Sequence, residues 1–198
     1  MLYDISRKIT KNSFVYIGDP KIVIRDFKTV EEDGFRVSKI IMGLHTETHI
    51  DFPAHILKDG KTSSSYDISH FSGNALVVDI ADLDFAIKIS DGIDAIFIKT
   101  ENFETYYLTP KLEKYRSITE KQARRIAKRK IKFVGIDWPT IEKTYDGDTF
   151  HKLFLGNDIL IIENLDFTHV VAGLYKFYAF PMDIPNVEAA LTRVVLEK

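Results

Sequence analysis

The chain has 198 residues, of which 45% are hydrophobic and 28% charged, with no cysteine, six histidines and a formal net charge of −2. These proportions are typical of a globular protein and exclude a disulfide-stabilised miniprotein, a collagen-like fibre and a disordered charged tail. Because cysteine is absent, thiolate catalysis, iron–sulfur clusters and cysteine-type zinc sites are excluded, and any metal must be held by His, Asp and Glu.

The first half of the chain is predicted to consist mainly of short strands. Runs of β-branched and aromatic residues favour strands over residues 13–17, 21–27, 35–42 and 75–80. Turns are expected at Gly18-Asp19-Pro20 and at Glu32-Asp33-Gly34, between the early strands. A weaker pattern favours a helix over residues 82–89.

The second half adds strands over residues 95–100, 132–137, 159–163, 176–180 and 192–196, several of them almost continuously apolar, as in strands covered on both faces. The clearest helix begins at Ser117, where Ser117-Ile118-Thr119-Glu120 has capping-box spacing, and a weaker helix is expected over residues 109–115. We therefore predict an α/β fold with a β-rich mixed sheet of parallel and antiparallel pairs. Residues 1–198 form a single domain in this prediction, because no repeat or long linker interrupts the chain.

Charge and hydropathy also bear on partners and location. The small net charge produces no strong field that would attract nucleic acid or an anionic membrane. No stretch approaches the ~18 apolar residues of a membrane span, and the start, MLYDISRKIT, lacks the apolar core of a signal peptide. We interpret the basic run EKQARRIAKRKIK at residues 120–132 as a solvated helix face. The expected protein is cytoplasmic, with no nucleic-acid partner and no membrane partner.

The most informative segment is GLHTETHIDFPAHIL at residues 43–57, which concentrates three of the six histidines, His45, His49 and His55. Thr46, Thr48, Ile50 and Pro53 disfavour a helix here. An extended strand would place His45, Glu47, His49 and Asp51 on one face, where two imidazoles and a carboxylate form a chelating set for Zn²⁺ or Mn²⁺. Pro53 then ends the strand, so that His55 can lie beside the metal as a proton carrier.

A catalytic metal needs ligands from more than one segment. His151 opens the run HKLFLGNDILIIENL, which places Glu163 at the end of a strongly apolar strand, where a cation would explain a buried carboxylate. His70 and His169 lack such surroundings and are interpreted as ordinary histidines.

These residues resemble a known family. HTETHIDFPAH at residues 45–55 is similar to the pattern His-x-Gly-Thr-His-x-Asp-x-Pro-x-His of the cyclase-type metal-dependent hydrolases, which include bacterial kynurenine formamidases and isatin hydrolases. The segments YDIS, YIGDP, GIDAIFIKT, FVGIDWPTIE and FYAFPMDIPNVEAALTRVVL extend the resemblance from end to end.

The resemblance implies a ligand set, a metal and an architecture. The implied metal ligands are His45, His49, Asp51, His151 and Glu163, and His55 would be the catalytic acid or base. The metal would be Zn²⁺, with Mn²⁺ as the alternative, as one ion or as two ions bridged by the aspartate. The family fold is a mixed α/β domain of the swivelling β/β/α type. It is usually dimeric, with neighbouring subunits helping to close the active site, so we expect a homodimer or higher homo-oligomer.

One residue departs from the family pattern. Glu47 stands at the position of the glycine and adds volume and a negative charge where a backbone commonly approaches a ligand closely. If the strand alternation holds, Glu47 points toward the metal face, as an extra ligand, as a block to the substrate or as a partner for a cationic substrate group. If the chain bulges, Glu47 points to solvent.

The predicted activity is metal-assisted hydrolysis of a small amide. A divalent cation lowers the pKa of bound water from about 15.7 toward ~7 and polarises the carbonyl, while His55 delivers a proton to the leaving amine. The resemblance favours an arylformamide of the N-formylkynurenine type. The alternatives are a cyclic amide such as isatin, or a metal-binding protein whose activity is altered or lost through Glu47. Four aromatic residues either line the pocket or belong to the core: Phe52, Tyr66, Phe71 and Trp138.

Overall fold

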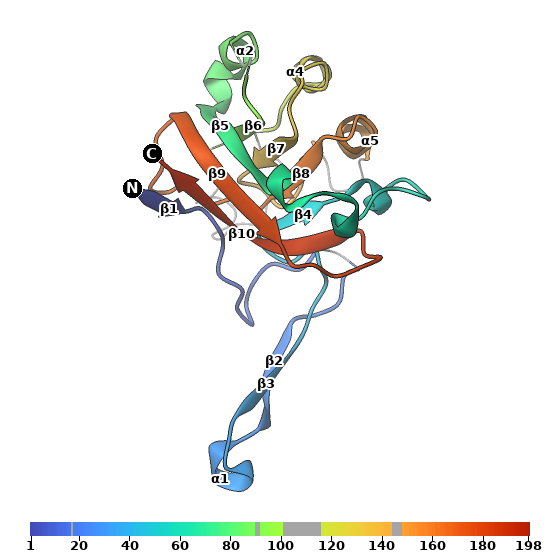
Figure 1. Cartoon of the computed structure of the whole chain (residues 1–198), viewed down its shortest axis with the longest axis vertical. Coiled ribbons are helices and arrows are strands. Elements are labelled where there is room, and N and C mark those ends of the chain that lie inside the picture. The colour runs from blue at the N-terminus through green and yellow to red at the C-terminus, as the bar shows by residue number, and fades with distance from the viewer. Residues whose placement is uncertain (17, 90–91, 101–115, 144–147) are drawn as a thin grey trace.

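A large mixed sheet forms the body of the protein (Figure 1). The computed structural model describes residues 1–16, 18–89, 92–100, 116–143 and 148–198. Eight strands pair in the order β1-β10-β4-β8-β7-β6-β5-β9, and β9 also pairs with β10, which closes the sheet into a barrel-like arrangement. Their bounds are β1 (Leu2–Asp4), β4 (His49–Asp51), β5 (Ser72–Asp79), β6 (Ala95–Lys99), β7 (Phe133–Ile136), β8 (Leu160–Glu163), β9 (Gly173–Pro181) and β10 (Ala189–Glu197).

The predicted mixed α/β class is confirmed by the strand directions and the helices. β5, β6, β7 and β8 run parallel, whereas β1, β4, β9 and β10 pair antiparallel. Parallel neighbours need crossover connections, and here these contain α2 (Leu83–Ala86), α4 (Glu120–Ile126) and α5 (Thr149–Leu155). All three helices stand on the same side of the sheet (Figure 1). Short 3₁₀ turns occur at η1 (Pro53–His55), η2 (Ser63–Ser65), η3 (Ile68–Phe71) and η4 (Ile80–Asp82).

Two apolar cores explain why the parallel strands read as continuous apolar runs. In β6, Ile96 and Ile98 belong to the core under the helices, whereas Ala95 and Phe97 belong to the core on the other face of the sheet. Because successive strand residues point to opposite faces, a strand covered on both sides must be apolar at every position. The six strands predicted from residue 75 onward are confirmed as β5 to β10, with ends that differ from the predicted ones by a few residues.

Several local predictions need correction. Residues 13–16 form no strand; Phe14 instead packs against the helix-side core, and position 17 lies outside the described residues. β1 was not predicted, because three residues are too few to show an alternation. The capping box lies two residues later than expected, with Thr119 and Gln122 exchanging the two bonds. The predicted helix over 82–89 shortens to α2, and the one over 109–115 lies outside the described residues.

A long two-stranded arm projects from the body and is the least globular part of the molecule (Figure 1). It consists of β2 (Val23–Lys28), the single-turn helix α1 (Val30–Asp33) and β3 (Val37–Ile41). β2 and β3 pair only with each other, as a separate sheet. The expected turn at residues 32–34 becomes the end of α1, closed by Gly34 in the left-handed conformation with φ 77°.

Three of the seven basic side chains in the run at residues 120–132 form ion pairs with other residues that the structure describes. Arg124 Nη2 lies 2.6 Å from Glu120 Oε1, Arg125 pairs with Asp84, and Lys132 Nζ lies 3.0 Å from Asp94 Oδ1. These pairs are consistent with a solvated helix face. In the described part of the chain, no helix is long and apolar enough to cross a membrane.

Candidate metal centre

Short elements from distant parts of the chain position the predicted ligands. β4 carries His49 and Asp51 on one face, two residues apart, and it lies in the sheet between β10 and β8. Glu163 is the last residue of β8 and stands directly opposite His49 in the antiparallel pair. His151 comes from the first turn of α5, the helix that follows strand β7. The sheet therefore brings together residues more than 100 positions apart.

The prediction of one extended strand from His45 to Asp51 is wrong for its first half. Only His49–Asp51 is a strand, and Glu47 has a φ of 53°, in the left-handed region. A left-handed residue reverses the local direction of the chain, so the strict alternation of sides ends there. The conformation costs roughly 1–2 kcal/mol for a residue with a Cβ and nothing comparable for glycine. The glycine of the family pattern thus matches a backbone requirement of this position.

The five predicted ligand side chains nevertheless converge on one point. Oδ1 of Asp51 lies 2.9 Å from Nδ1 of His45 and 3.1 Å from Nε2 of His49. On the other side, Oδ2 of Asp51 lies 3.6 Å from Nε2 of His151. Glu163 completes the group, 3.7 Å from His49 Nε2 and 3.4 Å from His151 Nε2. Asp51 is the central residue, with a different set of imidazoles facing each of its oxygens.

This donor set fits a divalent cation. Both oxygens of Asp51 are buried, and neither accepts a well-formed hydrogen bond from the described residues, although imidazole nitrogens lie about 3 Å away. A buried carboxylate without hydrogen bonds is costly unless a cation neutralises it. His, Asp and Glu are the ligands that Zn²⁺ and Mn²⁺ accept, and the two faces of Asp51 suit a bridging role between two ions.

The electrostatics of the cluster also favour a cation. Burial alone would lower the pKa of His45, but the charge of Asp51 outweighs it and raises that pKa to about 9. Burial likewise opposes the charged form of His151, but the nearby carboxylates of Asp51, Glu142 and Glu163 outweigh it and raise its pKa to about 12. Burial would raise the pKa of Asp51, yet the charges of His49 and His45 hold it well below its usual range. The site therefore holds positive charge strongly, as protons or as metal.

A second layer of contacts holds the ligands in place. Nδ1 of His49 lies 2.6 Å from the carbonyl oxygen of Glu47, which directs Nε2 toward Asp51. The side-chain amide of Asn164 donates to the same carbonyl at 3.1 Å. Glu47 therefore contributes its backbone to the site. Its carboxylate is buried and belongs to neither group of converging metal-ligating side chains found among the described residues. The burial of this carboxylate contradicts the solvent-facing alternative for Glu47.

His55 lies at the mouth of the site, at the end of η1. Its ring centroid is 4.4 Å from that of His45 and 5.3 Å from that of His151. Partial burial lowers the pKa of His55, and the positive charges of the neighbouring imidazoles add to this effect. A neutral imidazole beside the ligands can accept or deliver a proton. Its ring also comes close enough to His45 and Asp51 to act as a ligand, so both roles are open to it.

A cavity of about 360 Å³ opens directly onto the cluster. Its walls include His45, His55, His151 and Glu163 together with Phe14, Tyr16, Ile56, Pro139 and the carboxylates of Asp19 and Asp148. None of the four aromatic residues proposed from the sequence lines it. Phe52, Phe71 and Trp138 are core residues, and Tyr66 packs against the core while its hydroxyl donates to Asp158. The aromatic wall comes instead from residues before the arm, in the segment that was predicted to be a strand.

Two site residues were missed from the sequence. Glu142 lies 3.0 Å from Nδ1 of His151, and Glu188 lies 3.5 Å from Nε2 of His45. Glu142 is buried, but it lies in the loop six residues after the end of β7, so no strand pattern pointed to it. Glu188 is in an exposed loop and gave no signal. His70 packs against the rings of Tyr66 and Phe71, and His169 is exposed.

Known proteins resemble this chain in sequence and in fold. The family model described as "Putative cyclase" matches residues 3–143. A kynurenine formamidase of Bacillus cereus is 26% identical over 98% of this chain and 95% of its own length. A solved structure titled as a potential metal-dependent hydrolase with cyclase activity has a TM-score of 0.81 at 28% identity, covering 99% of this chain and 96% of that one. Isatin hydrolase A of Labrenzia aggregata shares the fold, with a TM-score of 0.80 at 16% identity, covering 99% of this chain and 93% of that one.

Proposed function

Because this chain belongs to the Cyclase family, we propose that it is a metal-dependent hydrolase that cleaves the amide bond of arylformamides. The observation that carries the proposal is the buried carboxylate of Asp51, with imidazoles on both sides, behind a cavity of about 360 Å³ that His45, His151 and Glu163 line. That volume suits a substrate with one aromatic ring. The similarity to a kynurenine formamidase supports an N-formylkynurenine-like substrate.

Each group of the site has a role in this proposal. His45, His49, Asp51, His151 and Glu163 would hold one or two ions of Zn²⁺ or Mn²⁺. Such a cation supplies an activated water at neutral pH and polarises the substrate carbonyl. Phe14 and Tyr16 would pack against the aryl group. His55 would take up a proton from the water and deliver it to the aryl amine as the bond between that amine and the formyl carbon breaks, so that one water and one formamide give formate and the free amine.

The proposal is tested by hydrolysis assays on metal-stripped and reloaded protein. N-formyl-L-kynurenine, formanilide, isatin and a phenyl ester are offered to protein loaded with Zn²⁺ or Mn²⁺. We expect release of formate from the two formamides, lost on chelation and restored by metal. Protein that binds metal stoichiometrically but hydrolyses none of these compounds would contradict the proposed hydrolase activity. If isatin were the only compound hydrolysed, the substrate class would be cyclic amides and not arylformamides.

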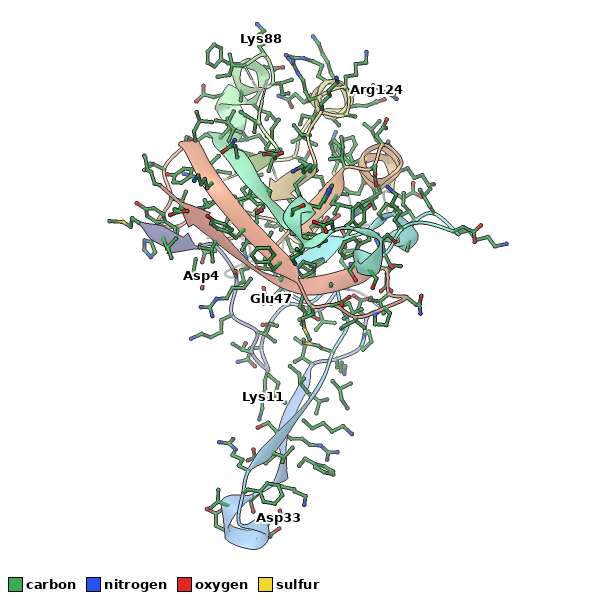
Figure 2. All side chains as sticks on the ribbon, viewed as in Figure 1. Asp4, Lys11, Asp33, Glu47, Lys88 and Arg124 are labelled. Carbon is green, nitrogen blue, oxygen red and sulfur yellow. The ribbon has the colours of Figure 1, made fainter. Side chains whose placement is uncertain are left out.

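We further propose that the protein forms a homodimer through the arm. Seven large apolar side chains of the arm are exposed: Val23, Phe27, Val30, Phe35, Val37, Ile40 and Ile41. None of them belongs to either core, and Figure 2 shows the side chains of the arm standing clear of the body. An isolated two-stranded hairpin is marginally stable at best in water. In a closed symmetric dimer, each copy would help to cover the apolar side chains of the other copy's arm. No such surface would remain for a third copy to bind.

The charges of the arm support the same proposal. Arg25 and Lys39 stand directly opposite each other, and neither has an ion pair with another described residue. Like charges in facing positions destabilise a strand pair. An acidic surface of a second copy would offset this repulsion.

The arm is tested with the double variant Phe27→Ser and Ile40→Ser, two side chains that are 65% and 51% exposed. By analytical ultracentrifugation we expect twice the mass of one chain for the wild type and the mass of one chain for the variant. Phe85→Ser, which removes an equally exposed ring on α2, is the matched control and should remain dimeric. A monomeric wild type, or a double variant that stays dimeric, would refute the arm interface.

A further inference from the structure

Glu142 is a buried carboxylate that neither the ligand set nor the proposed proton transfer uses. It is 3% exposed and lies in the loop between β7 and α5. Its own backbone N–H donates to Oγ1 of Thr140 at 3.1 Å, which fixes the start of this loop.

One oxygen of Glu142 closes the beginning of α5. Oε1 accepts hydrogen bonds from the backbone N–H groups of Phe150 at 2.6 Å and His151 at 2.8 Å. The N-cap residue of this helix, Asp148, makes no capping bond with its own side chain. The first N–H groups of a helix need acceptors, and a carboxylate also interacts favourably with the positive end of the helix dipole. Glu142 thus performs the capping that Asp148 does not.

The same oxygen reaches the metal-facing histidine. Oε1 of Glu142 lies 3.0 Å from Nδ1 of His151, whose Nε2 faces Asp51 and Glu163. With the proton held on Nδ1, the Nε2 lone pair is free for a metal. The preceding residue acts on the other distant ligand, because the N–H of Ile141 donates to Oε1 of Glu163 at 2.6 Å. Two consecutive residues therefore fix both ligands that come from outside the histidine cluster.

We propose that Glu142 is a positioning residue for metal binding, which anchors the start of α5 and holds His151 with Nε2 directed at the metal. This inference rests on the proposed metal site and adds to it a specific determinant of affinity. Removing a carboxylate that orients a ligating histidine typically weakens metal binding by about 10–100-fold. Glu142 combines that role with a helix cap, so its loss would change both the orientation of His151 and the backbone that carries it.

The test compares the metal dissociation constants of Glu142→Ala, Glu142→Gln and the wild type by competition with a chromogenic chelator. We expect about 10–100-fold weaker Zn²⁺ binding for Glu142→Ala. The Zn²⁺ dissociation constant of Glu142→Gln should lie between those of the wild type and Glu142→Ala. Its amide oxygen still accepts hydrogen bonds but carries no charge. In the Zn²⁺-loaded wild type, the Nδ1–H of His151 should exchange slowly with solvent by NMR, and this signal should be lost in Glu142→Ala.

A control separates positioning from loss of stability. Thr119→Ala removes a cap of comparable size from α4, where the Thr119 side chain accepts from the N–H of Gln122. It should lower the melting temperature of the metal-free protein and leave Zn²⁺ affinity unchanged. Equal Zn²⁺ affinity of the wild type and Glu142→Ala would overturn the inference, as would an equal loss in Thr119→Ala. A wild type that binds no metal would instead refute the proposed function.

Discussion

Asp51→Asn is expected to abolish metal binding and with it the hydrolysis of formamides. The substitution keeps the shape of the side chain but removes the charge that faces His45 and His49 on one side and His151 on the other. Without that charge, the remaining neutral imidazoles and Glu163 are a much weaker set for a divalent cation. Metal content by atomic emission and formate release should both fall to background.

Thermal unfolding gives an independent measure of the same change. A metal present at 100 times its dissociation constant stabilises the folded protein by about 2.7 kcal/mol. Added Zn²⁺ should therefore raise the melting temperature of the wild type and leave that of Asp51→Asn unchanged. Asp59→Asn, at an exposed position, is the matched control and should behave as the wild type. Full metal content in Asp51→Asn would show that Asp51 is not a ligand.

His55→Gln is expected to lower kcat by about 10²–10⁴ while metal content remains at the wild-type level. The imidazole lies at the mouth of the site, beside His45 and His151, where a proton can pass to a leaving amine. Steady-state kinetics on formanilide, combined with metal analysis of the same sample, measure the two effects together.

The choice between two roles for His55 follows from that pair of measurements. If metal content falls together with kcat, His55 acts as a ligand with His45 and Asp51, a role that its position also permits. His70→Gln controls for loss of a partly buried histidine elsewhere, because His70 packs against Tyr66 and Phe71 and not against the site. Unchanged kcat in His55→Gln would remove His55 from the reaction.

The ligand types were predictable because they depend on residue chemistry. A cysteine-free chain leaves only His, Asp and Glu for a metal, and the crowding of His45, His49 and Asp51 in one segment stood out from the composition. Glu163 stood out because a carboxylate ended an apolar strand. The same reasoning did not reach Glu142, because it lies in the loop between β7 and α5, six residues beyond the end of the strand.

The direction of Glu47 was not predictable, although the sequence showed that the position is unusual. A strand and a left-handed turn both allow His45 and His49 to approach Asp51, and an alternating pattern does not distinguish them. In the structure, the φ of 53° at Glu47 replaces the alternation, and the carbonyl of Glu47 supports His49. A preference for glycine can report backbone conformation as well as closeness to a ligand.

The sequence by itself determined the mixed α/β class, most of the strands and the residue types of the candidate site, because these follow from local periodicity and from side-chain chemistry. Only the tertiary structure decided that β8 lies beside β4, that Phe14 and Tyr16 form the aromatic wall, and that residues 23–41 leave the body as an arm. Strand pairing depends on contacts between residues far apart in the chain. An exposed apolar strand reads in sequence like a buried one, because the residue types that cover a core also cover an interface.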